Sequence, residues 1–174
     1  MKWTIDKEFH WEMGHRVWAK KLDHPELSIE TECACKHLHG HSYVLKVFLG
    51  ADQLDQSAMV TDFKNLNFMK KFVDEVLDHK FLIDKNDPHF ELITGAKPKV
   101  VEEAPNFSPL TDFYKPNNEQ RKEHAASFIV VDFVPTSENI CAHLKDWAQN
   151  QIGNVATVVA VELWETKKSH CRYE

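Results

Sequence analysis

The chain of 174 residues has little of what breaks regular structure or keeps a chain unfolded, with only five glycines and no low-complexity tract. Eleven Phe and five Trp instead accompany a hydrophobic fraction of 43%, which is typical of a well-packed globular domain. One core usually organises on the order of 100 to 200 residues. We therefore expect residues 1–174 to form a single domain with one functional site.

The sequence also lacks an excess of positive charge and long apolar runs. Its formal net charge of -6 provides no field to hold a phosphate backbone, so we expect no nucleic acid partner. No run approaches the roughly 20 apolar residues that span a bilayer. The first residues, MKWTIDKEFHWEMGH, carry frequent charges instead of the apolar stretch of a signal peptide. We expect a cytoplasmic protein without membrane contact, whose four cysteines are thiols, metal ligands or catalytic groups.

Two segments alternate apolar and polar residues with the period of a half-buried strand. In residues 3–13 the apolar positions are mostly odd, and His15 falls on the same face if that strand continues. In residues 39–49 the apolar face begins at Tyr43, and His39 and His41 share its parity. Two histidines can therefore point the same way at the start of the second strand.

Further along the chain, helical spacing of apolar residues predicts one helix over LNFMKKFVDEVL, capped by Asp62 or Asn65, and a second that opens in PTSENICAHLKDW. Thr136 or Ser137 would be the N-cap of the second helix. The run FIVVDFVP favours a strand, and alternation over residues 155–163 predicts a last strand that runs into Glu165. Strands and two helices with mostly antiparallel connections indicate an α+β fold.

Two segments do not follow these patterns. Residues 20–32 form a charged connector. The stretch at about 86–127 holds five of the seven prolines, and we interpret it as a long surface insertion with patchy order.

The motif CACKHLHGHSY at residues 33–43 concentrates residues that bind metals. Because His39 and His41 are two positions apart on a strand, both can project from one face, and His15 is the natural third ligand. A catalytic zinc keeps three protein ligands and an open fourth position. Gly40 between the two histidines permits close approach of the backbone.

A second metal site can be drawn from the same motif. Cys33, Cys35, His39 and His41 would form a closed structural site of two thiolates and two imidazoles. Its ligand spacing is more cramped than the separated pairs usual in such sites.

Several separated motifs agree with one family. C-K-H-L-H-G-H-S-Y, preceded by G-H-R and followed in order by L-D-H, P-T-S-E-N and W-E-T, resembles the 6-pyruvoyltetrahydropterin synthase and 6-carboxytetrahydropterin synthase family. The resemblance implies the tunnelling fold (T-fold), a four-stranded antiparallel sheet with two helices packed on one face. It also implies a homo-oligomer in which sheets join into a barrel and active sites lie at subunit interfaces.

The resemblance assigns roles to matching residues. It implies that Zn2+ is bound by His15, His39 and His41, that Cys35 is the catalytic cysteine, and that Asp78 and His79 complete the proton-transfer machinery. It further implies that Glu165 anchors the pterin and that Thr136, Ser137 and Glu138 line the same pocket. The spacing C-x-x-x-H-G-H is that of the bacterial carboxy-type enzymes.

The activity implied is that of a zinc-dependent lyase, 6-carboxy-5,6,7,8-tetrahydropterin synthase. It would convert 7,8-dihydroneopterin triphosphate to 6-carboxytetrahydropterin, acetaldehyde and triphosphate in queuosine (7-deazapurine) biosynthesis. Within the family, a pyruvoyl-type or another pterin side-chain-cleaving enzyme is the alternative. A non-catalytic, zinc-stabilised binding domain is the alternative from another class, although it would need neither Cys35 nor the Asp78 and His79 pair.

Overall fold

The computed structural model describes residues 1–19, 26 and 33–174. The charged connector expected at 20–32 therefore lies outside the described residues, apart from Glu26. The chain divides into two compact units, each built from separate stretches of sequence. Unit 1 contains Met1–Glu12, His41–Asp78 and Ser137–Glu174, and unit 2 contains Met13–Gly40 and His79–Thr136.

The strands of the described residues form one mixed sheet of seven strands, where we expected four antiparallel ones. Their order in the sheet is β4-β5-β3-β1-β2-β6-β7. The pairs β2–β6 and β6–β7 are antiparallel, whereas β1–β3 and β3–β5 are parallel. The strands are β1 (Trp3–His15), β2 (His39–Ala51), β3 (Lys80–Asp84), β4 (Ser108–Pro109), β5 (Phe128–Val131), β6 (Thr157–Thr166) and β7 (Ser169–Tyr173).

The two alternating segments form β1 and β2, as predicted. His15 ends β1 and is 1% exposed, so the strand does continue and does turn this imidazole inward. The inward positions of β2 that follow the histidines are all buried: Tyr43, Leu45, Val47 and Leu49.

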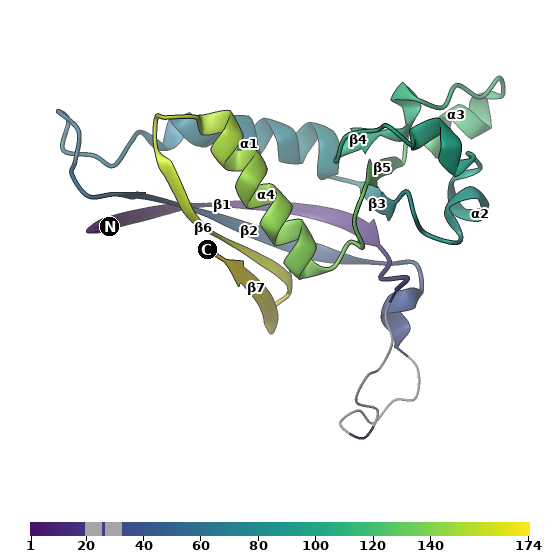
Figure 1. Ribbon diagram of the computed structural model, residues 1–174, viewed down its shortest axis with the longest axis horizontal. Coiled ribbons are helices and arrows are strands. Elements are labelled where there is room, and N and C mark those ends of the chain that lie inside the picture. The colour runs from purple at the N-terminus through teal and green to yellow at the C-terminus, as the bar shows by residue number, and fades with distance from the viewer. Residues whose placement is uncertain (20–25, 27–32) are drawn as a thin grey trace. The chain divides into compact units, whose positions relative to one another are not determined.

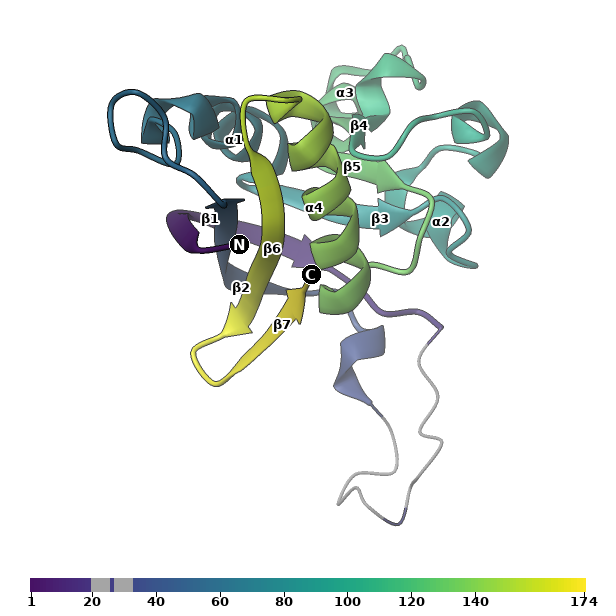
Figure 2. The same cartoon turned by 60° about the vertical axis from the view of Figure 1, so that its left-hand side comes forward.

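Unit 1 contains both helices predicted from the sequence. The first begins as a 3-10 turn (Phe63–Leu66), continues as α1 (Asn67–Phe72) and ends in a π-helical turn (Val73–Leu77). Asp62 caps it by accepting a hydrogen bond from the backbone N–H of Lys64. The second, α4 (Ser137–Ile152), packs on β6 and β7 (Figures 1 and 2). The two helices pack together through the rings of Phe72 and Trp147, whose centroids are 4.1 Å apart.

A β-bulge changes the pattern of β6 from the one expected. Two consecutive residues of β2 pair with Ala160 and Val158, so Val159 is an extra residue in β6. An extra residue reverses which positions face the core. The buried positions of β6 are accordingly Val158, Ala160, Val161 and Leu163, and the single stripe predicted over 155–163 is wrong.

In unit 2, the proline-rich insertion is more regular than its sequence suggested. It contains α2 (Phe90–Thr94), 3-10 turns (Pro98–Val101 and Leu110–Asp112), β4, and α3 (Glu119–Ala125), with β5 directly after it. Together with β3 and β5, these elements contribute to a small core whose buried members are Ile83, Phe90, Ala96, Val101, Ala104, Leu110, Ala125, Phe128 and Val130. Pro98 begins one 3-10 turn and Pro109 is the N-cap residue of the other, so these two prolines start short turns without unfolding the segment.

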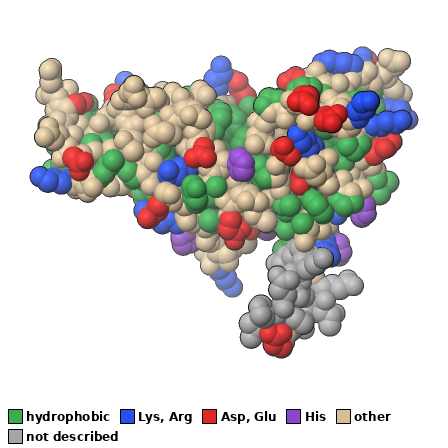
Figure 3. Space-filling view, viewed as in Figure 1, with side chains coloured by type: hydrophobic (Ala, Val, Ile, Leu, Met, Phe, Trp, Pro, Cys, Tyr) green, Lys and Arg blue, Asp and Glu red, His purple; other side chains and the backbone are tan. Residues whose placement is uncertain are grey.

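The surface drawn in Figure 3 intermixes basic and acidic side chains over the described residues. None of the helices in the described ranges combines the length and apolar character needed to cross a membrane.

Candidate metal centre and catalytic residues

Three histidines form the one cluster of potential metal-ligating side chains found among the described His, Cys, Asp and Glu residues. Candidate ligand atoms of His15, His39 and His41 all lie within 4.8 Å of one another. His15 is buried, and the two histidines of β2 are half-buried. The predicted ligand set is therefore assembled, whereas neither Cys33 nor Cys35 belongs to the cluster.

Hydrogen bonds set the tautomers of two of these imidazoles. The Nδ1–H of His15 donates to the carbonyl oxygen of Pro135 over 2.7 Å, and that of His39 donates to the carbonyl oxygen of His37 over 2.8 Å. A carbonyl oxygen can only accept, so the proton lies on Nδ1 and the lone pair on Nε2. Neutral imidazoles oriented through the other ring nitrogen are typical metal ligands. The residues present therefore fit a divalent ion such as zinc.

Two glycines let the strands that carry the histidines approach each other. A Cβ atom on Gly40 would lie 3.0 Å from the carbonyl oxygen of Met13. A Cβ atom on Gly14 would lie 3.3 Å from the carbonyl oxygen of His39 on β2, and 2.5 Å from Cδ2 of Phe81 on β3. The close approach predicted at Gly40 is confirmed, and a Cβ atom there would require the neighbouring backbone to shift by a few tenths of an ångström.

Cys35 lies in the 3-10 turn Ala34–Lys36, just before β2, and is half-exposed. The backbone N–H of Val17 donates to the carbonyl oxygen of Cys35 over 2.8 Å, which ties this turn to the chain leaving His15. None of the four cysteines forms a disulfide, in agreement with the sequence. The catalytic role of Cys35 stays a prediction.

Asp78 and His79 follow the π-helical turn directly. Asp78 Oδ1 accepts a hydrogen bond from the backbone N–H of Glu12 over 3.0 Å, so its carboxylate is fixed against β1. His79 has a φ of 58°, a left-handed conformation that is uncommon for residues other than glycine. Strained backbone and π-helical turns are both enriched at functional sites. That this pair transfers protons remains a prediction.

Glu165 occupies a second bulge, where Trp164 pairs with His170 and Thr166 pairs with Ser169. Burial raises the pKa of Tyr43 above its ordinary value, and the charge of Glu165 raises it further, so the two side chains interact electrostatically. Sequence reasoning did not assign Tyr43 to the site, although it shares the parity of His39 and His41. The predicted pterin anchor thus interacts electrostatically with a residue that contacts the metal cluster.

Thr136, Ser137 and Glu138, the predicted pocket residues, lie at the start of α4, and the structure gives some of their contacts. Burial raises the pKa of Cys171, and the charges of Glu138 and Glu165 add to that rise, so both carboxylates act electrostatically on one thiol of unit 1. The Ser137 hydroxyl donates to the carboxylate of Glu138 over 3.4 Å. Thr136 belongs to unit 2, where its N–H donates to the carbonyl oxygen of Val134. Contact of these residues with a pterin stays a prediction.

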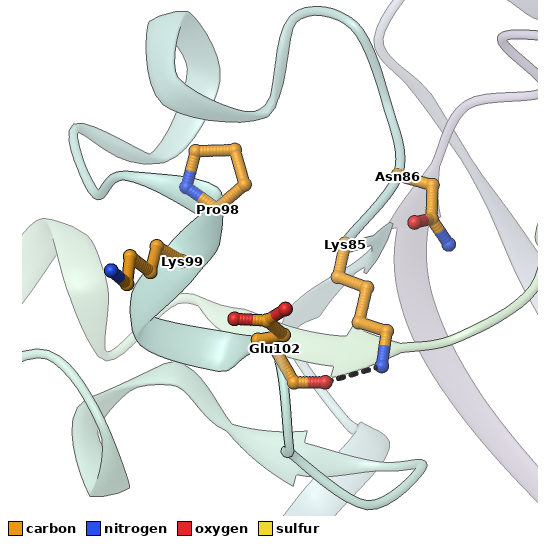
Figure 4. A pocket seen from close by; sticks show the side chains of 5 residues that line it. All are labelled: Lys85, Asn86, Pro98, Lys99 and Glu102. Atoms are coloured by element: carbon orange, nitrogen blue, oxygen red, sulfur yellow. Dashed lines mark hydrogen bonds between the residues drawn. The ribbon is translucent and has the colours of Figure 1, made fainter.

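Unit 2 has an open hollow of about 480 Å³ (Figure 4), and none of the residues that line it is a predicted site residue. Lys85, Asn86, Pro98, Lys99 and Glu102 line it. The Lys85 ammonium is already committed, since it donates to the carbonyl oxygen of Glu102 over 2.7 Å and pairs with Asp132 at 3.0 Å. The Lys85 ammonium is therefore not free to bind a ligand in this hollow.

The fold and the histidine cluster define an α+β protein with a candidate divalent-metal centre. The family model of 6-pyruvoyl tetrahydropterin synthase matches residues 4–174, and the chain belongs to this family of pterin enzymes of the lyase type.

Individual relatives agree with this placement. A 6-carboxy-5,6,7,8-tetrahydropterin synthase of Aquifex aeolicus is 32% identical, covering 100% of this chain and 99% of its own. The crystal structure of an uncharacterised protein from Wolinella succinogenes has 37% identity and a TM-score of 0.85, covering 98% of this chain and 97% of its own.

The 6-pyruvoyl tetrahydropterin synthase of Caenorhabditis elegans is a more distant structural relative, with 22% identity and a TM-score of 0.59 over 98% of this chain and 94% of its own. The expected tunnelling fold is thus confirmed, with seven strands in the sheet of this chain instead of four.

Proposed function

We propose that the protein is a zinc-dependent 6-carboxy-5,6,7,8-tetrahydropterin synthase. It converts 7,8-dihydroneopterin triphosphate to 6-carboxytetrahydropterin, acetaldehyde and triphosphate, a reaction that supplies queuosine biosynthesis. The observation that carries the proposal is the cluster of His15, His39 and His41, two of whose imidazoles are held in the metal-binding tautomer. The carboxy-type name of the Aquifex relative supports the choice of reaction.

Each side chain has a role that suits its chemistry. The carboxylate of Glu165 accepts hydrogen bonds from the N–H edge of the pterin. Thr136, Ser137 and Glu138 line the same pocket. Zinc, when bound to the three histidines, stabilises negative charge that develops on the oxygens of the substrate side chain. Cys35 acts as the general base that removes a proton from that side chain. His79, with Asp78, returns and relays protons.

The active form in this proposal is a homo-oligomer in the cytoplasm, with sites at subunit interfaces. The edge position of β7 supports it, because four of its five residues are exposed and an edge strand offers unpaired backbone groups to another chain. Light scattering coupled to size-exclusion chromatography tests this part, and a monomer at the concentration of the activity assay would contradict it.

The experiment that tests the reaction is incubation of the zinc-loaded protein with 7,8-dihydroneopterin triphosphate, followed by mass spectrometry of the pterin and a separate assay for acetaldehyde. We expect a carboxylated tetrahydropterin, acetaldehyde and triphosphate. Release of triphosphate with a three-carbon side chain retained would assign the pyruvoyl-type reaction instead. Binding of the pterin without any turnover would indicate a non-catalytic binding domain.

The proposed pterin anchor can be tested within the same strand. Glu165→Gln removes the charge that accepts the pterin N–H groups, and we expect KM to rise at least tenfold. Glu162→Gln is the matched control, because Glu162 lies on β6 but is paired with Arg172 at 2.8 Å. Equal effects of the two substitutions would remove Glu165 from the binding site.

A further inference from the structure

Three residues connect the metal cluster to the candidate base within unit 2. Residues 16–18, here named the spacer, begin directly after the predicted metal ligand His15. In the middle of the spacer, the N–H of Val17 donates to the carbonyl oxygen of Cys35 over 2.8 Å. The position of the spacer therefore influences where both His15 and Cys35 lie.

Two buried carboxylates hold the ends of the spacer. Arg16 Nε pairs with Asp87 Oδ2 at 2.9 Å, where the Asp87 side chain is 0% exposed and the Arg16 side chain 11%. The indole N–H of Trp18 donates to Asp84 Oδ2 over 2.8 Å. Asp84 and Asp87 are 2% and 3% exposed as whole residues. Neither link is an ordinary surface contact.

The loop that carries these carboxylates is itself braced. Asp84 Oδ1 accepts from the N–H of Asn86 over 2.9 Å, and Asp87 Oδ1 accepts from the N–H of His89 over 2.8 Å. The next residue, Phe90, starts α2 and is fully buried in the core of the insertion. Each aspartate thus uses one oxygen to shape its own loop and the other to hold the spacer.

The chemistry of these contacts favours orientation over simple packing. Burying charged groups is unfavourable unless their hydrogen bonds are satisfied, and apolar side chains of similar size would fill the same volume without that penalty. The indole N–H of Trp18 fixes direction as well as distance, whereas Arg16 Nε and Asp87 Oδ2 meet as an ion pair without hydrogen-bond geometry. The direction of the guanidinium is fixed by Arg16 Nη1, which donates to Nδ1 of His89 over 3.0 Å.

We propose that Asp84 and Asp87 are positioning residues that fix the spacer and, through it, the relative placement of His15 and Cys35. The proline-rich insertion then serves the metal centre as a rigid support. The part of this inference that concerns Cys35 rests on the proposed function, whereas the part that concerns His15 requires only that the histidine cluster binds zinc.

The test measures zinc affinity of the metal-free protein by competition with a chromophoric chelator, with no pterin present. Asp87→Asn removes the charge that holds Arg16, and Trp18→Phe removes one N–H while keeping a ring in place. Loss of a group that orients a metal ligand typically weakens metal binding about 10- to 100-fold, and we expect effects in that range. Val101→Ala is the control, because it loosens the core of the insertion while leaving both links intact.

All variants are compared at a temperature at which circular dichroism shows them folded. Weaker zinc binding in Trp18→Phe, with Val101→Ala at the wild-type affinity, supports the proposal even if Asp87→Asn does not fold. Unchanged affinity in Trp18→Phe, or an equal loss in Val101→Ala, overturns it, as does a wild-type protein that binds no zinc. If zinc affinity falls as expected but the wild type does not convert 7,8-dihydroneopterin triphosphate, only the proposed function fails.

Discussion

The ring of Tyr43 stands edge-on to the ring of His41, with centroids 5.7 Å apart and planes at 88°. Tyr43 also stacks on Trp11, with ring centroids 5.3 Å apart. The charge of Glu165 contributes to raising the pKa of Tyr43, so this buried phenol interacts both with a predicted metal ligand and with the predicted pterin anchor. The four residues all belong to unit 1.

Tyr43→Phe should change how stability depends on alkaline pH. Burial, aided by Glu165, raises the pKa of Tyr43 above its ordinary 10.0, so between pH 10 and the folded-state pKa only the unfolded chain loses this proton. The free energy of unfolding then falls by up to about 1.4 kcal/mol per pH unit. The substitution removes this contribution. Urea unfolding at pH 9 and pH 11 checks the prediction, and equal pH slopes in wild type and variant would contradict it.

His39→Ala should abolish binding of zinc, because two imidazoles do not complete a three-ligand site. Elemental analysis of the purified protein measures the bound metal. His143→Ala is the control, since the imidazole of His143 bonds to the carbonyl oxygen of Asn139 within α4. An unchanged zinc content in His39→Ala would refute the assignment of the cluster.

Cys35→Ala should retain zinc and pterin while turnover falls by at least about 100-fold, the usual effect of losing a general base. Equilibrium binding and product formation are measured on the same preparation. Cys33→Ala serves as the control for substitution in this segment. Loss of zinc in Cys35→Ala would instead show that this thiol is a metal ligand and restore the closed structural site.

Cys141 should resist alkylation in the folded protein. Burial raises its pKa to about 12, and the residue is 0% exposed, so little thiolate is present and little reagent can reach it at pH 8. Mass spectrometry after iodoacetamide treatment, with and without urea, measures this protection. Equal modification of Cys141 in both conditions would contradict it.

Gly40→Ala should destabilise the fold by about 1 to 3 kcal/mol, the usual effect of forcing extra volume into a packed region. Its Cβ atom would meet the Met13 carbonyl oxygen at 3.0 Å, on the strand that carries His15. Zinc affinity should therefore fall together with the thermal midpoint. A variant with both values unchanged would show that β1 and β2 can separate without consequence for the cluster.

Strand alternation predicted the histidine cluster because the relevant contacts follow one repeating pattern. His15, His39 and His41 each continue an apolar stripe of their own strand, and such a stripe identifies a common face without knowledge of the pairing. The capping of α1 by Asp62 is equally local. The roles of Cys35, Asp78, His79 and Glu165 came from motif resemblance, since no periodic pattern relates residues so far apart in the chain.

Three features of the fold were not predicted from the sequence, each for a specific reason. β3 was missed because KFLID is short and apolar, without the alternation expected of a strand with one exposed face. β7 was missed because SHCRY has little apolar character, and its place depends on pairing with β6. The insertion seemed irregular because its core collects single apolar residues from many short turns. Such a core depends on contacts between distant residues, which a local pattern does not reveal.

Glu165 is the extra residue of a bulge, so its side chain can change without a change in the pairing register of the β6–β7 hairpin. Residue 165 can therefore be exchanged, and a different group presented, while the cross-strand pair of Trp164 and His170 stays in place. Deleting the residue would have the opposite effect, because regular alternation would return and Thr166, the last residue of β6, would exchange faces. If the pterin-binding role proposed for Glu165 holds, substitutions at this bulge change ligand preference with little loss of hairpin stability.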